Sequence, residues 1–158
     1  RGHYLKQGGY GGGVGGNVLP LVPRVSRKAW FRQIQSFCAH RAYLTPHKLS
    51  RMLPETPDCC PRCGTAGAEF FHMIWNCAAL GECWREVVII INRATDRALP
   101  CSPVECLLWT FPRPAPKKAT NRFIDLALIT AKRQITIHWK SGRSSGVEAW
   151  RENLLKWE

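Results

Sequence analysis

Acidic residues are absent from the first third of this sequence. No Asp or Glu occurs before Glu55, and the whole chain of 158 residues has 23 Lys and Arg against 11 Asp and Glu, a formal net charge of +12. Such a surface attracts polyanions, and nucleic acid is the first candidate because phosphate contacts supply most non-specific affinity. The alternative is a solvated basic face that has no partner.

Long hydrophobic runs are absent as well. The longest lies at residues 87–91, whereas a membrane-spanning helix needs about 20 predominantly apolar residues. No segment combines a clean basic face with a large apolar face, as helices that lie on membranes do. We therefore expect no membrane partner, and we also expect no small-molecule substrate.

The sequence does contain a compact set of zinc-ligand residues. Cys60, Cys63, His72 and Cys77 follow the spacing C-x2-C-x8-H-x4-C, which supplies the four nitrogen and sulfur donors of a tetrahedral zinc site. Gly64, directly after the second thiol, lets the backbone turn back so that its N–H groups can approach the sulfurs. Since four ligands close the site, we expect a structural Zn2+ rather than a catalytic one.

Two alternatives to this site remain open. The cysteines could be buried reduced thiols or a disulfide pair, and Cys59 could replace its neighbour Cys60 as the first ligand. Because four of the eight cysteines fit metal better than a secreted disulfide scaffold, we expect a reducing compartment. The remaining ones are then ordinary reduced side chains, with a Cys101–Cys106 pair less favoured; they are Cys38, Cys83, Cys101 and Cys106.

Two helices are predicted before the zinc ligands. The first starts near Ser26, a suitable N-cap, and places four apolar side chains on one face. These side chains are Trp30, Ile34, Phe37 and Cys38. The second helix is short and opens with Thr45 as its N-cap and Pro46 at its first position. Together the two helices form a basic platform next to the zinc site.

One helix is predicted directly after the zinc ligands. Its apolar residues recur at helical spacing, and they are Leu80, Trp84, Val87, Val88 and Ile91. Trp84 lies on the same face as the valines. We therefore interpret it as a core residue rather than as a platform for base stacking.

A pair of helices is predicted at the C-terminal end. The first runs from about Asn121 to Trp139, and its Lys132 and Arg133 lie on a different face from its apolar stripe. The members of that stripe are Ile124, Ala127, Leu128, Ala131, Ile135 and His138. The second helix has its own stripe, made of Val147, Trp150, Leu154 and Trp157. We expect the two to pack as an antiparallel hairpin.

The predicted fold class is mainly α, with a small zinc knuckle packed among short helices and followed by the helical hairpin. Four segments are expected. Residues 1–21 form a disordered Gly-rich tail, residues 22–97 contain the basic helices and the knuckle, residues 98–120 form a Pro-rich linker, and residues 121–158 form the hairpin.

Several stretches together resemble one protein family. They are YLTPHKL at 43–49, CPRCG at 60–64, HMIWNC at 72–77, Trp84, ITAKRQITIHWK at 129–140 and EAW at 148–150. In this order they are similar to the zinc-binding C-terminal region of LINE-type (non-LTR) retrotransposon reverse transcriptases. The resemblance covers about residues 26–158. The knuckle alone is moderately specific, and the later block adds most of the specificity.

The resemblance implies one piece of a protein that nicks DNA and copies its own RNA into it by target-primed reverse transcription. Such a piece binds RNA or DNA and supports the polymerase core, in cytoplasmic ribonucleoprotein particles and in the nucleus. Cys60, Cys63, His72 and Cys77 correspond to the metal ligands. The sequence has no Asp-Asp pair in a hairpin context and no endonuclease carboxylate set, so we expect no enzymatic activity.

The leading functional hypothesis is a zinc-stabilised module that binds nucleic acid through a set of basic side chains. The residues expected to meet phosphates are Arg27, Lys28, Arg32, Lys48, Arg51 and Arg62. The first alternative is an interaction scaffold that docks on the polymerase or on a host protein. The second is a non-functional relic of a retroelement. Catalysis at the metal or at a cysteine is disfavoured because no thiol has a recognisable base beside it in sequence.

Overall fold

The structure, a computed structural model, describes residues 29–110, 118–143 and 146–156, and this part of the protein is mainly helical. Those residues form six α-helices and one short π-helix, and no strand. The mainly-α fold class is therefore confirmed. The elements are α2 (Ala29–Ala39), α3 (Pro46–Met52), η2 (His72–Asn76), α4 (Ala78–Thr95), α5 (Pro103–Leu108), α6 (Lys118–Ile137) and α7 (Val147–Leu155).

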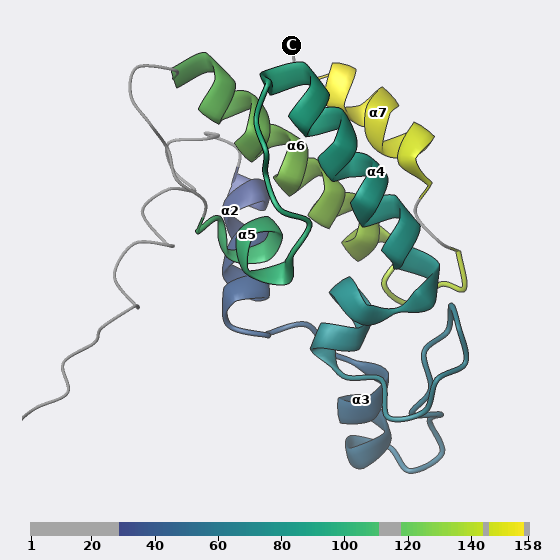
Figure 1. Ribbon diagram of the computed structural model, residues 1–158. Helices are drawn as coiled ribbons and strands as arrows, with labels where there is room; N and C mark the ends of the chain where they lie inside the picture. The colour runs from purple at the N-terminus through teal and green to yellow at the C-terminus, as the bar shows by residue number, and fades with distance from the viewer. Residues whose placement is uncertain (1–28, 111–117, 144–145, 157–158) are drawn as a thin grey trace, which may run out of the picture.

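Helix α6 lies at the centre of the molecule. It packs against α2, α4, α5 and α7, and Figure 1 shows α4 and α7 running alongside it. Most of its predicted stripe is buried, namely Ile124, Ala127, Leu128, Ala131 and Ile135. The Trp150 indole of α7 donates to the Ala127 carbonyl at 2.9 Å, and the Gln134 amide donates to the Ala149 carbonyl at 2.9 Å. The predicted hairpin of α6 and α7 is thus present; Trp157 lies outside the described residues.

Helix α4 connects this bundle to the segment that carries Cys60, Cys63, His72 and Cys77. All five of its predicted core residues are buried: Leu80, Trp84, Val87, Val88 and Ile91. The Trp84 indole nitrogen donates to the carbonyl of Ile74 at 2.9 Å and so joins α4 to η2. Trp84 is therefore a core residue, as predicted.

Helix α2 buries a different face from the predicted one. Phe31, Gln35 and Cys38 are buried, whereas Trp30 and Ile34 are half-buried and Phe37 is 37% exposed. The buried face is rotated because Gln35 is drawn into the core by a polar contact with α6 that the apolar pattern does not reveal. The proposed N-cap, Ser26, lies outside the described residues.

The polar contact comes from Lys132, which is fully buried and not on a separate face as predicted. Its ammonium donates to the Gln35 side-chain oxygen at 2.7 Å and to the Leu107 carbonyl at 2.7 Å. It also lies 4.4 Å from the centre of the Trp109 ring. Burial lowers the pKa of Lys132 to about 8. One buried cation thus joins α2, α5 and α6.

Part of the expected Pro-rich linker packs into the core. Leu99, Cys106, Leu107 and Trp109 are buried, and α5 contacts both α2 and α6. Residues 98–110 are therefore structured, because their prolines sit at helix starts and bends while the apolar residues between them find partners. Helix α6 then begins at Lys118, inside the range expected to be linker. Residues 111–117 and the expected disordered tail lie outside the described residues.

The described residues include no helix that is both long and apolar enough to cross a membrane. The longest helix, α6, carries Lys118, Arg122, Asp125, Lys132 and Arg133 along its length. This agrees with the short hydrophobic runs in the sequence.

Candidate metal centre

A tight turn carries the first two candidate ligands. The Cys60 amide donates to the Thr65 carbonyl and the Gly64 amide donates to the Cys60 carbonyl, both at 2.8 Å. Gly64 has a φ of +76°, a conformation that L-residues rarely adopt. The glycine therefore allows the chain to reverse after Cys63, so that Thr65 returns to Cys60.

The other two candidate ligands lie at the ends of η2. The Cys77 amide donates to the His72 carbonyl at 3.0 Å, which closes this single wide turn. Met73 and Ile74, within the turn, are completely buried. Burial of the middle of η2 fixes its two ends, so that His72 and Cys77 face the Cys60 turn.

The four side chains meet at one point. Their ligand atoms, the Sγ atoms of Cys60, Cys63 and Cys77 and a ring nitrogen of His72, all lie within 4.8 Å of one another. The Cys60 and Cys77 sulfurs are 3.8 Å apart, and the Cys63 sulfur is 3.3 Å from the His72 Nε2. Tetrahedral coordination at a Zn–S distance of 2.3 Å separates two sulfurs by roughly 3.8 Å. The cluster can therefore hold a metal ion, and its spacing is compatible with zinc.

The pKa values of Cys63 and Cys77 are shifted in opposite directions. Hydrogen bonding to the Thr65 side chain is the main cause that lowers the pKa of Cys63 to about 6, and the Thr65 backbone amide acts in the same direction. Burial raises the pKa of Cys77 to about 11, although the Ala79 backbone amide opposes this. Cys63 is thus set up as a thiolate, whereas Cys77 needs a cation nearby to ionise.

The remaining cysteines stand apart from the cluster. Cys59 is half-buried and is not among the converging ligands, so the turn selects Cys60. All eight thiols are free. Burial raises the pKa of Cys38 and Cys83 to about 11 and that of Cys106 to about 12. These values describe neutral, unreactive thiols, as expected for ordinary reduced side chains.

Arg62 takes part in the internal structure of the site. Its guanidinium donates to the Met73 carbonyl, and its Nη2 also lies 3.8 Å from the Met73 sulfur. The side chain is half-buried. Arg62 therefore links the Cys60 turn to η2, a role different from the expected phosphate contact. The position of Arg62 between Cys60 and Cys63 in the sequence is compatible with either role, a phosphate contact or a link to η2.

The end of α6 contacts the site from the other side. The Trp139 indole donates to the Leu44 carbonyl at 2.9 Å, and its ring lies 4.9 Å from that of Tyr43 and 6.1 Å from that of Phe70. A Cβ atom on Gly142 would lie 3.0 Å from the Pro61 carbonyl oxygen. The sequence analysis did not predict that Trp139 and Gly142 contact this region. A large apolar residue in the polar turn after α6 could have indicated that Trp139 is buried against another segment.

The other predicted phosphate ligands are spread over two helices. Arg32 on α2 and Lys48 and Arg51 on α3 are exposed, and the Lys48 ammonium donates to the Arg41 carbonyl at 2.9 Å. Arg27 and Lys28 lie outside the described residues. Helix α3 begins as predicted. Thr45 is its N-cap, with a hydroxyl that accepts from the Lys48 amide at 3.2 Å, and Pro46 is its first residue.

Helix α3 is attached directly to the metal-ligand region. The His47 amide donates to the Ala68 carbonyl at 3.3 Å. Helix α3, with its exposed cations, is thus joined to the segment that runs between Cys63 and His72. No model of a known protein family matches this sequence.

Proposed function

We propose that this chain is a zinc-stabilised module that binds RNA or DNA and has no catalytic step of its own. The observation that carries the proposal is the attachment of α3, with its exposed Lys48 and Arg51, to a cluster of three thiols and one imidazole. Bound zinc would supply a structural cross-link between the Cys60 turn and η2. The exposed Lys48 and Arg51 side chains would then bind phosphates from a helix that is held in a fixed position.

The resemblance to LINE-type reverse transcriptases gives this module a context. In that context it would follow a polymerase, dock on it and hold RNA or DNA during target-primed reverse transcription. The support for this part of the proposal is the series of sequence stretches between residues 43 and 150. The buried Trp84 and Trp139 give two of the motif tryptophans a structural role.

Metal content tests the first half of the proposal. We expect one zinc per chain by elemental mass spectrometry of the purified protein, and loss of that zinc in Cys63→Ser. Cys101→Ser is the matched control, because both thiols are exposed and only Cys63 belongs to the cluster. A protein without zinc, or equal zinc in both variants, would contradict the proposal and favour a decayed retroelement.

Salt-dependent binding tests the second half. We expect a labelled single-stranded RNA to bind with an affinity that falls steeply between about 50 and about 200 mM salt. Replacing Lys48 and Arg51 by Gln should reduce the slope of log affinity by about 0.7 for each lost phosphate contact. Replacing Arg85 and Arg93 by Gln is the matched control, because both are exposed on α4 and the net charge changes by the same amount. The slope of log affinity should stay steeper in this control than in the Lys48 and Arg51 variant.

A docking module is the second candidate function. An apolar groove of about 380 Å³ lies between α3, the Cys60 turn and the end of α6, with Leu44, Leu49 and Trp139 among its lining residues. A docking module would keep its partner after the Lys48 and Arg51 substitutions and would show no salt-dependent RNA binding. The two candidates thus give opposite results in the same experiment.

A further inference from the structure

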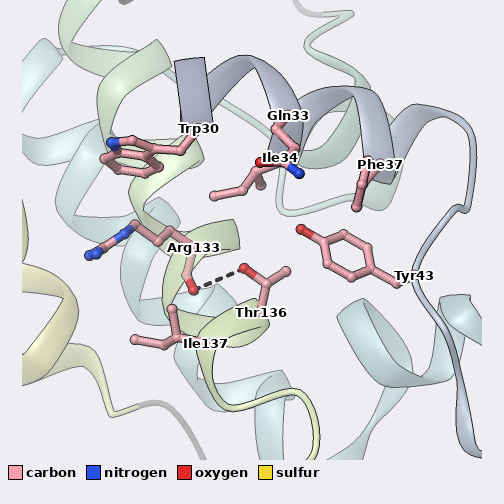
Figure 2. A pocket seen from close by; sticks show the side chains of 8 residues that line it. All are labelled: Trp30, Gln33, Ile34, Phe37, Tyr43, Arg133, Thr136 and Ile137. Carbon is pink, nitrogen blue, oxygen red and sulfur yellow. Dashed lines mark hydrogen bonds between the residues drawn. The ribbon is translucent and has the colours of Figure 1, made fainter. Parts of the chain in front are cut away.

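A second groove lies on another side of the molecule, between α2 and the C-terminal half of α6. It has a volume of about 390 Å³ and is lined by side chains from both helices and from the loop after α2. Figure 2 shows Trp30, Gln33, Ile34, Phe37, Tyr43, Arg133, Thr136 and Ile137 around this space. We call it the α2/α6 groove. A volume of this order is within the range of small-ligand sites.

Three aromatic rings occupy the walls of the α2/α6 groove. Trp30 is half-buried, Phe37 is 37% exposed, and the rings of Phe37 and Tyr43 meet edge to face at 5.4 Å. The Arg133 guanidinium lies 4.7 Å from the centre of the Trp30 ring. Rings and guanidinium planes of this kind are the surfaces on which unpaired nucleobases stack.

Polar groups at the α2/α6 groove can meet the edge of a base. Gln33 is exposed and offers an amide donor and acceptor. Burial raises the pKa of Tyr43 to about 12, so its phenol stays protonated, and within the groove it already hydrogen-bonds with the Thr136 side chain. The Thr136 hydroxyl donates to the Arg133 carbonyl at 3.0 Å, which leaves its oxygen able to accept.

The charge around the α2/α6 groove has one sign. Helix α2 contains no acid, and the only acid of α6, Asp125, is buried. Arg122 and Arg133 are eleven residues apart, which places them on the same face of α6 about 16 Å apart. In contrast, Glu82 on α4 and Glu148 and Glu152 on α7 are exposed. The only charged side chain that lines the α2/α6 groove is that of Arg133, whereas the exposed faces of α4 and α7 carry charges of both signs, so the groove favours an anionic ligand.

We infer that the α2/α6 groove binds an unpaired nucleobase of a single-stranded nucleic acid whose phosphates follow the basic face of α6. The inference rests on the proposed nucleic-acid-binding function and adds a base-stacking site to it. This site is separate from the phosphate contacts expected on α3, since Lys48 and Arg51 are not among its lining residues. Arg32, on α2 but also absent from the lining, is not assigned to it.

The test uses the full zinc-loaded chain and labelled single strands of about ten nucleotides, one of RNA and one of DNA. Ile137→Glu introduces a negative charge at the α2/α6 groove, at a residue that is 54% exposed. Ile89→Glu is the matched control, because it makes the same change on α4 at a residue that is 47% exposed. We expect Ile137→Glu to weaken binding at least about tenfold and Ile89→Glu by no more than about twofold.

A second measurement does not depend on any variant. A strand that carries 5-iodouridine is irradiated on the wild-type protein, and the cross-linked peptides are identified by mass spectrometry. We expect cross-links at Trp30, Phe37 or Tyr43. Stronger binding of RNA than of DNA would identify a contact to the 2′-hydroxyl.

The outcomes separate this inference from the function on which it rests. Two results would overturn the assignment of the α2/α6 groove and leave the proposed function standing. One is salt-dependent binding that both Glu variants weaken equally; the other is cross-links confined to α3 and the Cys60 turn. No salt-dependent binding by the wild type would overturn both. Capture of a protein ligand that Ile137→Glu abolishes, without any strand binding, would assign the groove to protein docking instead.

Discussion

The knuckle, residues 60–77, and the bundle around α6 are stabilised in different ways. Half of the residues in α6 are buried, and the helix packs on four other α-helices and on η2. In the knuckle, every residue from 61 to 67 is exposed or half-buried. That loop has too little buried apolar surface to fix its own position. Packing alone can thus define the bundle, whereas the loop that carries Cys63 would be fixed by the ligand bonds of the proposed metal site.

Removal of the metal is expected to have the largest effect and to act on the knuckle only. Structural zinc sites contribute apparent free energies of about 10 to 16 kcal/mol. After chelation, hydrogen exchange at the poorly packed loop, residues 61–67, should accelerate, while the amides of α6 stay protected. Mass spectrometry of exchanged peptides measures both regions at once. Equal loss of protection in α6 would show that the two regions unfold together, and the comparison would fail.

Trp150→Ala should have the converse effect, on the bundle. This side chain is completely buried and donates to the Ala127 carbonyl. Its truncation should lower the free energy of unfolding by about 3 to 5 kcal/mol in urea titrations. Leu155→Ala, at a residue that is 65% exposed, should change it by less than about 0.5 kcal/mol. Zinc content should remain unchanged in the folded variant; its loss would argue against separate means of stabilisation.

The buried Lys132 predicts an unusual dependence of stability on pH. Its pKa is about 8 in the folded protein and 10.5 for the free side chain, so between these values the unfolded chain binds more protons. The free energy of unfolding should therefore rise with pH across this window, by up to roughly 1.4 kcal/mol per pH unit. Below about pH 8 this contribution is constant, because both states are protonated.

Lys132→Met provides the reference for that measurement. The raised pKa values of Cys38 and Cys106 make stability fall as pH rises above the ordinary thiol value of 9.0. The difference between wild type and variant removes most of this effect; the rest is a further rise of both thiol pKa values when the Lys132 charge is lost. At pH 7 the variant should differ from wild type by only about 1 kcal/mol, because loss of the desolvated ammonium offsets an unpaired Gln35 oxygen. Parallel pH profiles would refute the assignment.

Gly142→Ala should have the smallest effect, at the joint between the two regions. The added Cβ would lie 3.0 Å from the Pro61 carbonyl oxygen, so the knuckle or the loop after α6 must shift slightly. We expect a loss of about 1 kcal/mol in thermal unfolding. Gly81→Ala, inside α4, should instead stabilise by about 0.5 to 1 kcal/mol through helix propensity. If both substitutions changed the free energy of unfolding in the same direction, the close contact between Gly142 and Pro61 would not matter for stability.

Apolar periodicity and ligand spacing were enough to predict much of this molecule. The stripe of α4 was correct because its five core residues all meet apolar partners. The ligand set was correct in placing Cys60, Cys63, His72 and Cys77 together, because the metal-binding geometry is encoded within 18 residues and depends on one local turn at Gly64.

Polar burial and long-range contacts could not be predicted in the same way. Lys132 follows Ala131 in a helix, and nothing nearby in sequence shows that Gln35 and the Leu107 carbonyl will receive its ammonium. The same contact explains why the buried face of α2 was wrong. Residues 98–110 were interpreted as a linker because of their prolines, but burial of Trp109 depends on helices distant in sequence.

The contact between Trp139, Gly142 and the region of the Cys60 turn has a consequence for the order of synthesis. A ribosome releases the four ligands about 60 residues before it releases these two contacts. During that interval the nascent chain could bind metal while one side of its metal-ligand region lacks its cover. A chain cut short within α6 would retain every ligand and stay permanently in that half-assembled state.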